Sequence, residues 1–577
     1  MTETLLLLGK IIILTHLLGY GFSSLALPSS LKKYSLLLSP WVYMVVAVVL
    51  GGILSLAKFP TQLSAYIVAG LSLASYAYSR SSSPHNQKVQ LSLRPETFIL
   101  LAILVYHALP LIVKIGYPTT LSLGNLDPVS YASVSEFLKE KTVLDGGVIN
   151  VYKPSTWSIV DLIHYGYRWG PPLLLSQLSV LLGAETYQIY TLVTLFYFVF
   201  TANLLLVSLS LLGLKNLLAR LMLVFLFSLN STLMYWVYHG FLSQFLFSGL
   251  LVLALIISLS REDSKVKHAI LFGFVFSATT TIYPEVSPVL ILPVLLTQIS
   301  SKNGFVRGAL TIPMGIIISY LLNPVTFRTT YNQITRILSA TTDTSFIGWE
   351  LLRFPNALEI LGLYNLNYSR PLGFVFGLAT LFLLLWVLII SLRQLKKPIL
   401  FWFFTSGVVV SIFFSSAIID NFFAFHRSIS YFIWLYILLF VAQFFGQSKS
   451  PRPLLIFSIL LFSLLIRSST RTWVQWYRHA RAVDIPLISL SSCCSYNGVL
   501  MTSDVLLGEY DLWQRVWQEH FLRNQKIIDL QNHTLVEIPP FTPVLARKDK
   551  LTHYEKIIPP GKTIWENQSY ILMEQAR

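Results

Sequence analysis

Long apolar runs constrain this chain more than any other feature of its sequence. A helix that crosses the hydrocarbon core of a bilayer needs about 20 apolar residues, and about fourteen runs reach or approach that length. They lie near residues 5 to 27, 36 to 57, 61 to 79, 97 to 116, 187 to 213, 217 to 238, 240 to 260, 269 to 284, 286 to 300, 308 to 324, 371 to 393, 399 to 419, 428 to 446 and 453 to 467. Only 12% of the residues are charged, against about a quarter in a globular domain. The sequence predicts an all-α polytopic membrane protein.

Two apolar segments need separate treatment. The N-terminal run has no basic region before it and is longer than the roughly 7 to 15 residues of a signal-peptide core, so we expect a retained transmembrane helix. The run PPLLLSQLSVLLG (171 to 183) has only about 13 residues and begins with two prolines. Its length and prolines favour a re-entrant or interfacial helix.

Basic residues predict the orientation, because short cytoplasmic loops of membrane proteins collect Lys and Arg. If 171 to 183 does not cross the membrane, the basic connections all fall on one side: 31 to 34, 80 to 94, 261 to 268, 302 to 307, 393 to 397 and 447 to 452. Both termini and two long loops, 117 to 170 and 325 to 370, then lie outside the cytoplasm. The net charge of +16 therefore marks one membrane face, and no nucleic-acid partner is expected.

The chain is predicted to have three parts: N-terminal transmembrane helices (1–96), a transmembrane core (97–467) and an extracytoplasmic C-terminal domain (468–577). The last part is less apolar, and IPLISL, GVLMTS and TLVEIPP have the composition of short strands, whereas EYDLWQRVWQEHFLRNQ has helical periodicity. A small mixed α/β domain is the expectation. Cys493 and Cys494 are adjacent and cannot form a cysteine-based metal site.

Ionisable residues are costly at membrane depth, so their positions indicate function in a membrane chain. In the predicted topology they gather on the outer face. The candidates are Asp127, Asp145, Asp161, His164, Arg168, His239, Gln244, Tyr283, Glu285, Arg328, Arg336, Arg353, Asp420, His426 and Arg427. A carboxylate beside arginines suits transfer of a group from a phosphate-linked donor, since the carboxylate accepts a proton and Arg binds phosphate. Neither a Gly-rich phosphate loop nor an HExxH metal motif is present.

The order of GNLDPVSY, YRWGPPLLLSQLSVLLG, YHGFLSQF and IYPEVSP resembles the GT-C superfamily of integral-membrane glycosyltransferases, over roughly residues 97 to 467. The resemblance implies a polyprenyl-phosphate sugar as donor, Asp127 as catalytic base and Glu285 as a second acid near the donor phosphate or a metal. Donor or substrate binding is expected from the residues Arg168, His164, Tyr283, His239, Arg328 and Arg427. The resemblance implies no certain cofactor; a divalent metal stays possible, although the single acid Asp127, where many relatives have an acidic pair, argues against one.

Each candidate also has a simpler structural interpretation. Asp127 before Pro128 is a typical helix N-cap pair, and Tyr131, Val134 and Leu138 would then share one helix face. Arg168 lies among aromatic residues that anchor at lipid headgroups. Asp145 could simply be a turn residue, and Asp161 could cap a short helix. Ordinary packing would explain the three histidines His164, His239 and His426. Solvated loops would explain Glu285, Asp420 and Arg427. The sequons at Asn367, Asn532 and Asn567 fall outside in this topology.

The predicted function is an inverting glycosyltransferase of the cytoplasmic membrane, moving a sugar to a glycan, lipid or protein acceptor on the outer face. The alternative is a transporter or flippase of lipid-linked glycans, for which about fourteen spans would be ordinary. An enzyme is favoured because the polar residues gather at outer ends of spans and not at the midplane. A third reading is an assembly or anchoring protein, whose working part would be the C-terminal tail.

Overall fold

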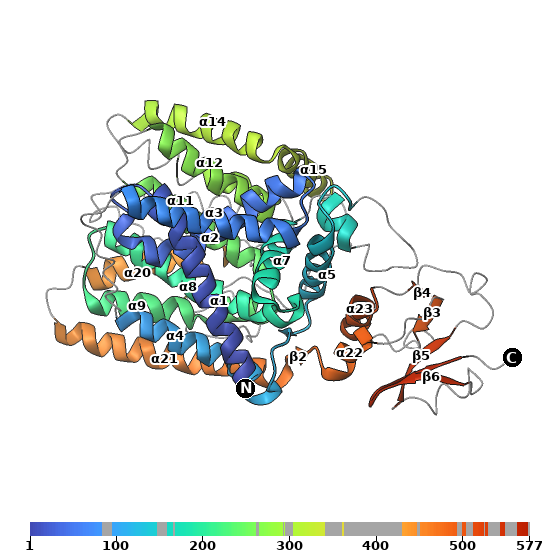
Figure 1. The fold of residues 1–577 in the computed structure, drawn as a ribbon. Helices are drawn as coiled ribbons and strands as arrows, with labels where there is room; N and C mark the ends of the chain where they lie inside the picture. Colours follow the sequence, from blue (N-terminus) through green and yellow to red (C-terminus); the bar gives the residue numbers. More distant parts are fainter. Residues whose placement is uncertain are drawn as a thin grey trace.

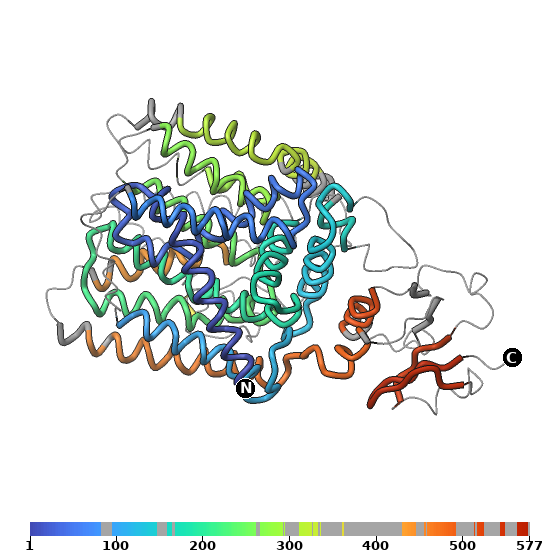
Figure 2. Tube along the Cα trace, viewed as in Figure 1, coloured from blue at the N-terminus to red at the C-terminus, as the bar shows by residue number. Residues whose placement is uncertain are grey.

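The structure is a computed structural model of all 577 residues, and it places most of the chain in helices (Figure 1). It describes residues 1–82, 95–146, 158–164, 168–260, 265–291, 294, 304–340, 361–362, 430–446, 451–492, 499–502, 512–523, 526–528, 543–548 and 562–574. A bundle of long helices forms the main body, and a small sheet lies beyond one end of it (Figure 2).

The bounds of the elements follow the predicted runs closely. The helices are α1 (Thr2–Ala26), η1 (Lys32–Tyr34), α2 (Ser35–Leu56), α3 (Thr61–Ser82), α4 (Pro95–Leu109), η2 (Pro110–Ile115), α5 (Asp127–Glu140), η3 (Val160–His164), α7 (Gly170–Leu182), α8 (Thr186–Leu211), α9 (Leu217–Ser228), α10 (Ser231–Tyr238), α11 (Leu242–Leu259), α12 (Lys265–Ile282), η4 (Pro284–Leu290), α14 (Gly304–Leu322), α15 (Pro324–Ala340), α20 (Ile433–Gly446), α21 (Pro451–His479), α22 (Ile485–Ser489), η5 (Leu490–Ser492) and α23 (Leu512–Phe521). The strands are β1 (Leu121–Ser122), β2 (Arg481–Ala482), β3 (Val499–Thr502), β4 (Lys526–Ile528), β5 (Val544–Arg547), β6 (Thr563–Glu566) and β7 (Tyr570–Met573).

Five helices within the described ranges are long and apolar enough to cross a membrane, and α9 with α10 makes a sixth span if the bent pair is counted as one. The chain is a multi-pass α-helical membrane protein. The predicted spans at 371 to 393 and 399 to 419 lie outside the described residues, so the count of fourteen stays a prediction. Helix α7 (170–182) is short and apolar, and it packs against α2, α3, α5 and α8.

Proline and asparagine change three of the predicted spans. The run 217 to 238 is not one straight helix, because the Asn230 side chain accepts hydrogen bonds from Thr232 N and Leu233 N and starts α10 at a bend of 41°. The run 97 to 116 changes from α4 to the π-helix η2 at Pro110. The run 286 to 300 begins as the 3₁₀-helix η4, which contains Pro284 and Pro288.

The predicted span 453 to 467 is too short, because α21 continues to His479. Its second half packs on the bundle through aromatic rings. Trp473 Nε1 donates to the Tyr106 carbonyl at 3.0 Å, which is the carbonyl that Pro110 leaves without an intrahelical partner. Trp476 stacks on Tyr238 with 4.4 Å between ring centroids. Tertiary packing therefore extends the helix beyond its apolar stretch.

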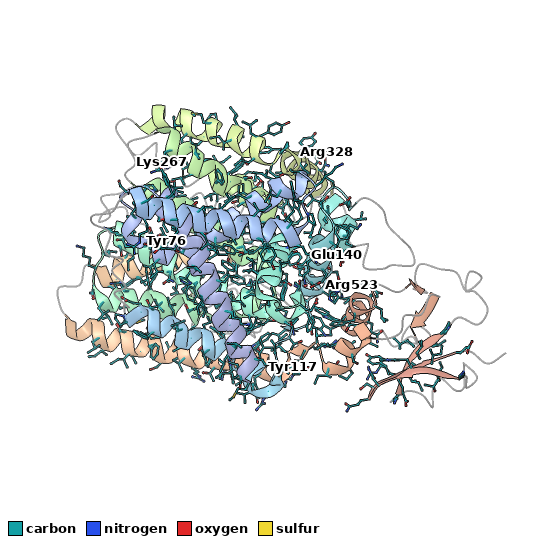
Figure 3. All side chains as sticks on the ribbon, viewed as in Figure 1. Tyr76, Tyr117, Glu140, Lys267, Arg328 and Arg523 are labelled. Carbon is teal, nitrogen blue, oxygen red and sulfur yellow. The ribbon has the colours of Figure 1, made fainter. Side chains whose placement is uncertain are left out.

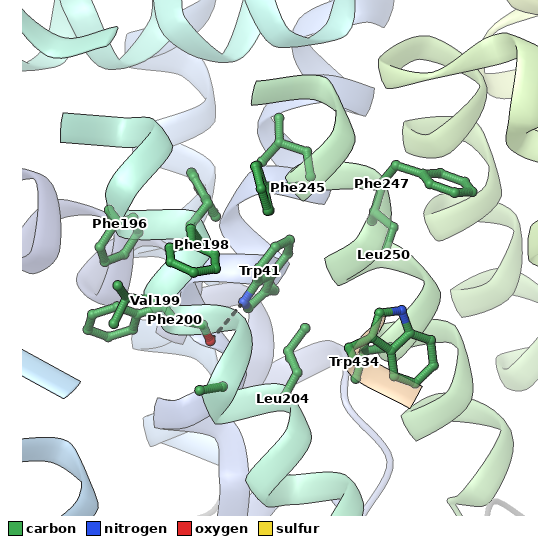
Figure 4. Close-up of a cluster of buried hydrophobic side chains, with 14 of the residues drawn as sticks. Trp41, Phe196, Phe198, Val199, Phe200, Leu204, Phe245, Phe247, Leu250 and Trp434 are labelled. Atoms are coloured by element: carbon green, nitrogen blue, oxygen red, sulfur yellow. Dashed lines mark hydrogen bonds between the residues drawn. The ribbon is translucent and has the colours of Figure 1, made fainter. Parts of the chain in front are cut away.

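The core of the bundle lies where α2, α8, α11 and α20 meet (Figure 4). Trp41 of α2 is fully buried among phenylalanines of α8 and α11, and its indole N–H donates to the Phe200 carbonyl at 3.4 Å. A Cβ atom at position 249 would lie only 1.9 Å from the Trp41 ring, so Gly249 is needed for this close packing.

The C-terminal region contains a mixed five-stranded sheet of order β4-β3-β5-β7-β6. Strands β3 and β4 are parallel, and α23 connects them, as parallel neighbours require. GVLMTS and EYDLWQRVWQEHFLRNQ were predicted correctly as strand and helix. IPLISL was predicted wrongly, because Asp484 caps α22 through the Leu487 N–H at 3.0 Å. TLVEIPP lies outside the described residues.

Candidate functional site

The start of α5 lies against the turn that follows α10. Strand β1 pairs with β2, and Leu123 N donates to the Tyr238 carbonyl at 2.9 Å. Gly240 has a positive φ of 79°, and a Cβ there would lie 2.7 Å from Pro128 Cγ, so only glycine fits this corner. The turn YHGF therefore lies directly against the DP pair.

Asp127 is the first residue of α5 and not its N-cap. The N-cap is Leu126, which forms no side-chain capping bond, whereas Asn125 Oδ1 accepts a hydrogen bond from Asp127 N at 3.3 Å. The Asp127 side chain is half-buried and forms no hydrogen bond with the residues that the structure describes. The capping interpretation is wrong, because Asp127 is the first helical residue and its side chain forms no capping bond within the described chain.

Arg168 and Glu285 form an ion pair although 117 residues separate them in the sequence. Arg168 Nε donates to Glu285 Oε1 at 2.9 Å, and Nη2 contacts the same oxygen. The pair depends on Gly170, where a Cβ would lie 2.9 Å from the Thr281 carbonyl carbon, so α7 and the end of α12 approach closely. Within the described chain, Glu285 Oε2 is buried and has no hydrogen-bond partner.

Two tyrosines enclose this ion pair. Arg168 Cζ lies 4.3 Å from the centroid of the Tyr283 ring, a cation–π distance. Tyr131 is fully buried on α5, and its hydroxyl pairs with that of Ser243. Burial raises the pKa of Tyr131 well above its usual range, and the Asp127 carboxylate raises it further while Arg168 lowers it. Both charges therefore lie near the Tyr131 hydroxyl.

Arg168 is influenced by all of these groups. Burial lowers the pKa of its guanidinium, but Glu285, Tyr283, Tyr131 and Asp127 outweigh burial and raise it well above the ordinary value. The guanidinium is therefore a permanent positive charge. A half-buried carboxylate, a fixed cation and phenol hydroxyls at one place can accept a proton and bind a phosphate.

Two more of the predicted site residues, His239 and Arg328, can be placed by their side chains. His239 follows α10, and its Nδ1 bonds to the Tyr235 carbonyl at 2.7 Å. Burial lowers the pKa of His239 to about 4, so the ring is neutral. Arg328 is exposed on α15 (Figure 3). His164 lies at the end of η3, and Arg427, with Arg353, Asp420 and His426, lies outside the described residues.

Asp145, Asn567 and the remaining acids have local settings. Asp145 Oδ2 accepts bonds from Thr142 N and Thr142 Oγ1 at 2.8 and 2.7 Å, as predicted for a turn. Asp161 lies exposed within η3. The Asn567 amide donates to Ser489 Oγ at 2.5 Å, whereas Asn367, Asn532, Cys493 and Cys494 lie outside the described residues. Across the described ranges, no group of three His, Cys, Asp or Glu side chains could hold a metal ion.

Sequence reasoning missed two tyrosines of the site. Tyr131 was assigned only to the apolar face of an amphipathic helix, although its position four residues after Asp127 puts both on one side of α5. Tyr431, whose hydroxyl pairs with that of Tyr283, lies within the run 428 to 446, which was predicted only as an apolar span. The spacing of Asp127 and Tyr131 was the one usable signal.

No protein-family model matches this chain, and no curated protein matches it. Solved structures similar to it include ArnT from Cupriavidus metallidurans in the apo state (12% identity, 83% of this chain and 98% of that chain, TM-score 0.42). The same protein bound to undecaprenyl phosphate has 11% identity, the same coverage and a TM-score of 0.43. Archaeal oligosaccharyltransferase AglB from Archaeoglobus fulgidus, in complex with an inhibitory peptide and a dolichol-phosphate, has 12% identity, 80% and 70% coverage and a TM-score of 0.37. With every TM-score below 0.5, these likenesses do not assign the chain to a family.

Proposed function

We propose that the protein is an integral-membrane glycosyltransferase that moves a sugar from a polyprenyl-phosphate donor to an acceptor hydroxyl or amide. One observation carries the proposal. Arg168 and Glu285, 117 residues apart in the sequence, form an ion pair against the Tyr283 ring, and the charges of both Asp127 and Arg168 act on the hydroxyl of Tyr131.

The chemistry needs few groups. Asp127 accepts the proton of the acceptor O–H or N–H as that atom attacks C1 of the sugar from the face opposite the phosphate. A new bond to C1 forms, the C1–O bond to the phosphate breaks, and polyprenyl phosphate leaves with the electron pair. Attack from the opposite face inverts the anomeric centre.

Arg168 is proposed to bind the phosphate. Glu285 takes the Nε and Nη2 donors of one edge, and the other N–H groups of the guanidinium are the ones available to a phosphate. Stacking on Tyr283 and pairing with Glu285 orient the guanidinium before the donor arrives, so little side-chain entropy is lost on binding. Glu285 is therefore proposed as an orienting acid, with a metal left open.

The test is Asp127→Asn, with Glu140→Gln as the matched control, since Glu140 is an exposed acid at the last position of the same helix. The assay uses the purified full chain in liposomes with a panel of sugar-labelled undecaprenyl-phosphate hexoses and pentoses and a membrane extract as acceptor. Loss of a general base slows transfer by about 10²- to 10⁴-fold. Normal transfer and normal cell glycans in the Asp127→Asn variant would disprove the assignment.

A transporter of lipid-linked glycans is the second candidate, and the broken helix α9–α10 is the observation in its favour. The same liposomes separate the two functions. A transporter moves the labelled lipid across the bilayer and leaves the sugar–phosphate bond intact, whereas a transferase releases undecaprenyl phosphate.

A further inference from the structure

Helix α5 packs between two partners, and only one of them is the helical bundle. Its bundle face carries Tyr131 and Ser135, and Ser135 Oγ donates to the Pro172 carbonyl at 2.9 Å. The opposite face carries Val129 and Ala132, which are buried in a separate apolar cluster with the C-terminal region. The Asp127 helix is thus not held by the bundle alone.

The C-terminal partner is the pair of helices α22 and α23, which lie between α5 and the sheet (Figure 1). Trp517 and Phe521 of α23 fill the cluster beneath Val129 and Ala132. Phe521 also meets the Tyr187 ring edge-on at 5.3 Å, at the start of α8. Large aromatic side chains contribute most of the apolar area in such contacts.

A buried hydrogen bond fixes the register of this contact. His520 Nδ1 lies 2.9 Å from Ser133 Oγ, and both side chains are buried. The two residues are 387 positions apart. If this hydrogen bond broke, each polar group would remain buried without a partner. The bond therefore favours one relative position of α5 and α23.

A charged cluster closes the edge of the contact. Lys139 Nζ lies 2.9 Å from Glu136 Oε2, and Arg523 Nη2 lies 3.6 Å from the same oxygen. Burial opposes ionisation of Glu136, but Lys139 and hydrogen bonds from Lys139 and Thr186 lower its pKa to about 2. Thr186 N donates to Glu136 Oε1 at 2.9 Å, so the cluster joins α5, α8 and α23.

We infer that α23 and the turn after it position the proposed catalytic base: the contacts of His520 and Arg523 with α5 set the place of Asp127 relative to Arg168. This inference rests on the proposed function. His520 and Arg523 are positioning residues, since they contact α5 one to three turns beyond Asp127 and do not contact Arg168, Glu285 or Tyr283 in any interaction of the described chain. Arg168 and Glu285 belong to the bundle, so a shift of α5 changes the distance between base and phosphate site.

The variant that tests this is His520→Phe, which keeps an aromatic ring in the cluster and removes the bond to Ser133. A displaced base slows chemistry, so kcat should fall at least about tenfold while KM for the donor stays within about twofold. The pH–rate profile should shift as well, which a simple loss of folded protein would not cause. His520→Asn, which can still bond to Ser133, should recover most of the rate.

The matched control is Tyr570→Phe. It removes the hydrogen bond between Gln518 Nε2 and Tyr570 Oη (3.2 Å), which lies inside the C-terminal region, and kcat should remain unchanged. Hydrogen exchange gives a readout that needs no substrate. In His520→Phe, amides of α5 should exchange at least about tenfold faster while those of α7 keep their rates.

Measuring Asp127→Asn in parallel separates the two proposals. Full transfer by Asp127→Asn would remove the proposed function. If Asp127→Asn is inactive while His520→Phe keeps its kcat, its pH profile and its α5 exchange, the function stands and the positioning inference is overturned. A fall in kcat with an unchanged pH profile, matched by Tyr570→Phe, would also overturn it.

Discussion

Two arginine–glutamate pairs join distant parts of this chain, and they differ in what surrounds them. Arg168–Glu285 connects the start of α7 to η4, and Arg220–Glu96 connects α9 to the start of α4. The arginines are equally shielded, with side chains 15% and 17% exposed. Glu96 lies at the end of α4 remote from η2 and Asp127, so the second pair is far from the site along that helix.

The difference lies in geometry and neighbours. Arg168 donates a true hydrogen bond through Nε, stacks on Tyr283 and feels the charge of Asp127. Arg220 Nε is 2.9 Å from Glu96 Oε1, but the orientation is not that of a hydrogen bond. The two arginines are buried to a similar extent, but their proposed roles differ. Arg168 is oriented for binding, whereas Arg220 only links two helices. Burial alone does not identify a site.

Substituting each arginine by lysine is the most direct test of the difference between the two ion pairs. Arg168→Lys keeps the positive charge but loses the planar fork, so two charge-assisted bonds of about 1.5 to 3 kcal/mol are weakened. We expect transfer to fall by roughly 10²-fold in kcat/KM. Arg220→Lys is the control and should stay within about twofold in the liposome assay. Equal losses of kcat/KM in both variants would contradict a binding role that belongs to Arg168 and not to Arg220.

Glu96→Gln tests the Arg220–Glu96 pair by removing the charge of its acidic partner. Removing one partner of a buried pair costs up to about 3 to 5 kcal/mol, but Arg220 retains some access to solvent, so we expect about 2 kcal/mol. Chemical denaturation in detergent should show this loss of stability. The rate per folded molecule should match the wild type, and a rate reduced beyond the folded fraction would link this end of the bundle to the site.

Glu285→Gln should have a smaller effect on the rate than Arg168→Lys. The amide oxygen can still accept from Arg168 Nε, so the guanidinium keeps its orientation and loses only charge pairing. We expect about a tenfold fall in kcat/KM, which corresponds to about 1.4 kcal/mol. A loss as large as that of Asp127→Asn would instead assign Glu285 a direct chemical or metal-binding role.

The sequence predicted most of the described helices, for a physical reason, and it singled out candidate site residues whose roles stay predictions. Apolar runs must become helices in a bilayer, and Asp127, Arg168, Tyr283 and Glu285 were recognisable as polar groups at helix ends. The pairing of Arg168 with Glu285 was not predictable. It depends on the close approach at Gly170, and hydropathy carries no information on tertiary contacts of that kind.

The missed features share a cause. The break at Asn230, the continuation of α21 to His479 and the helix at Ile485 are decided by single capping residues or by aromatic packing. Periodicity averages over many residues and cannot detect such local terms. Tyr131 was read as apolar because a buried tyrosine and a site tyrosine have the same spacing.

The smallest expected effect concerns pH and the C-terminal contact. Burial lowers the pKa of His520 to about 3; Arg523 and Lys139 act in the same direction, and Glu136 opposes them. The unfolded histidine titrates near 6.5, so between about pH 6.5 and 3 the unfolded chain binds a proton that the folded chain does not. The free energy of unfolding must therefore fall as the pH decreases through that window. Above about pH 6.5 the contribution of His520 to stability is fully present. From pH 7.5 to 5.5 we expect His520 to cause a loss of about 1 kcal/mol in the free energy of unfolding.

Glu136 does not contribute in this pH range, since its own window lies below about pH 4.5. In thermal unfolding of the full chain, His520→Asn should reduce the slope by the share of His520, whereas His239, whose pKa is also lowered, should keep its own share. An unchanged slope would show that other groups control the acid sensitivity.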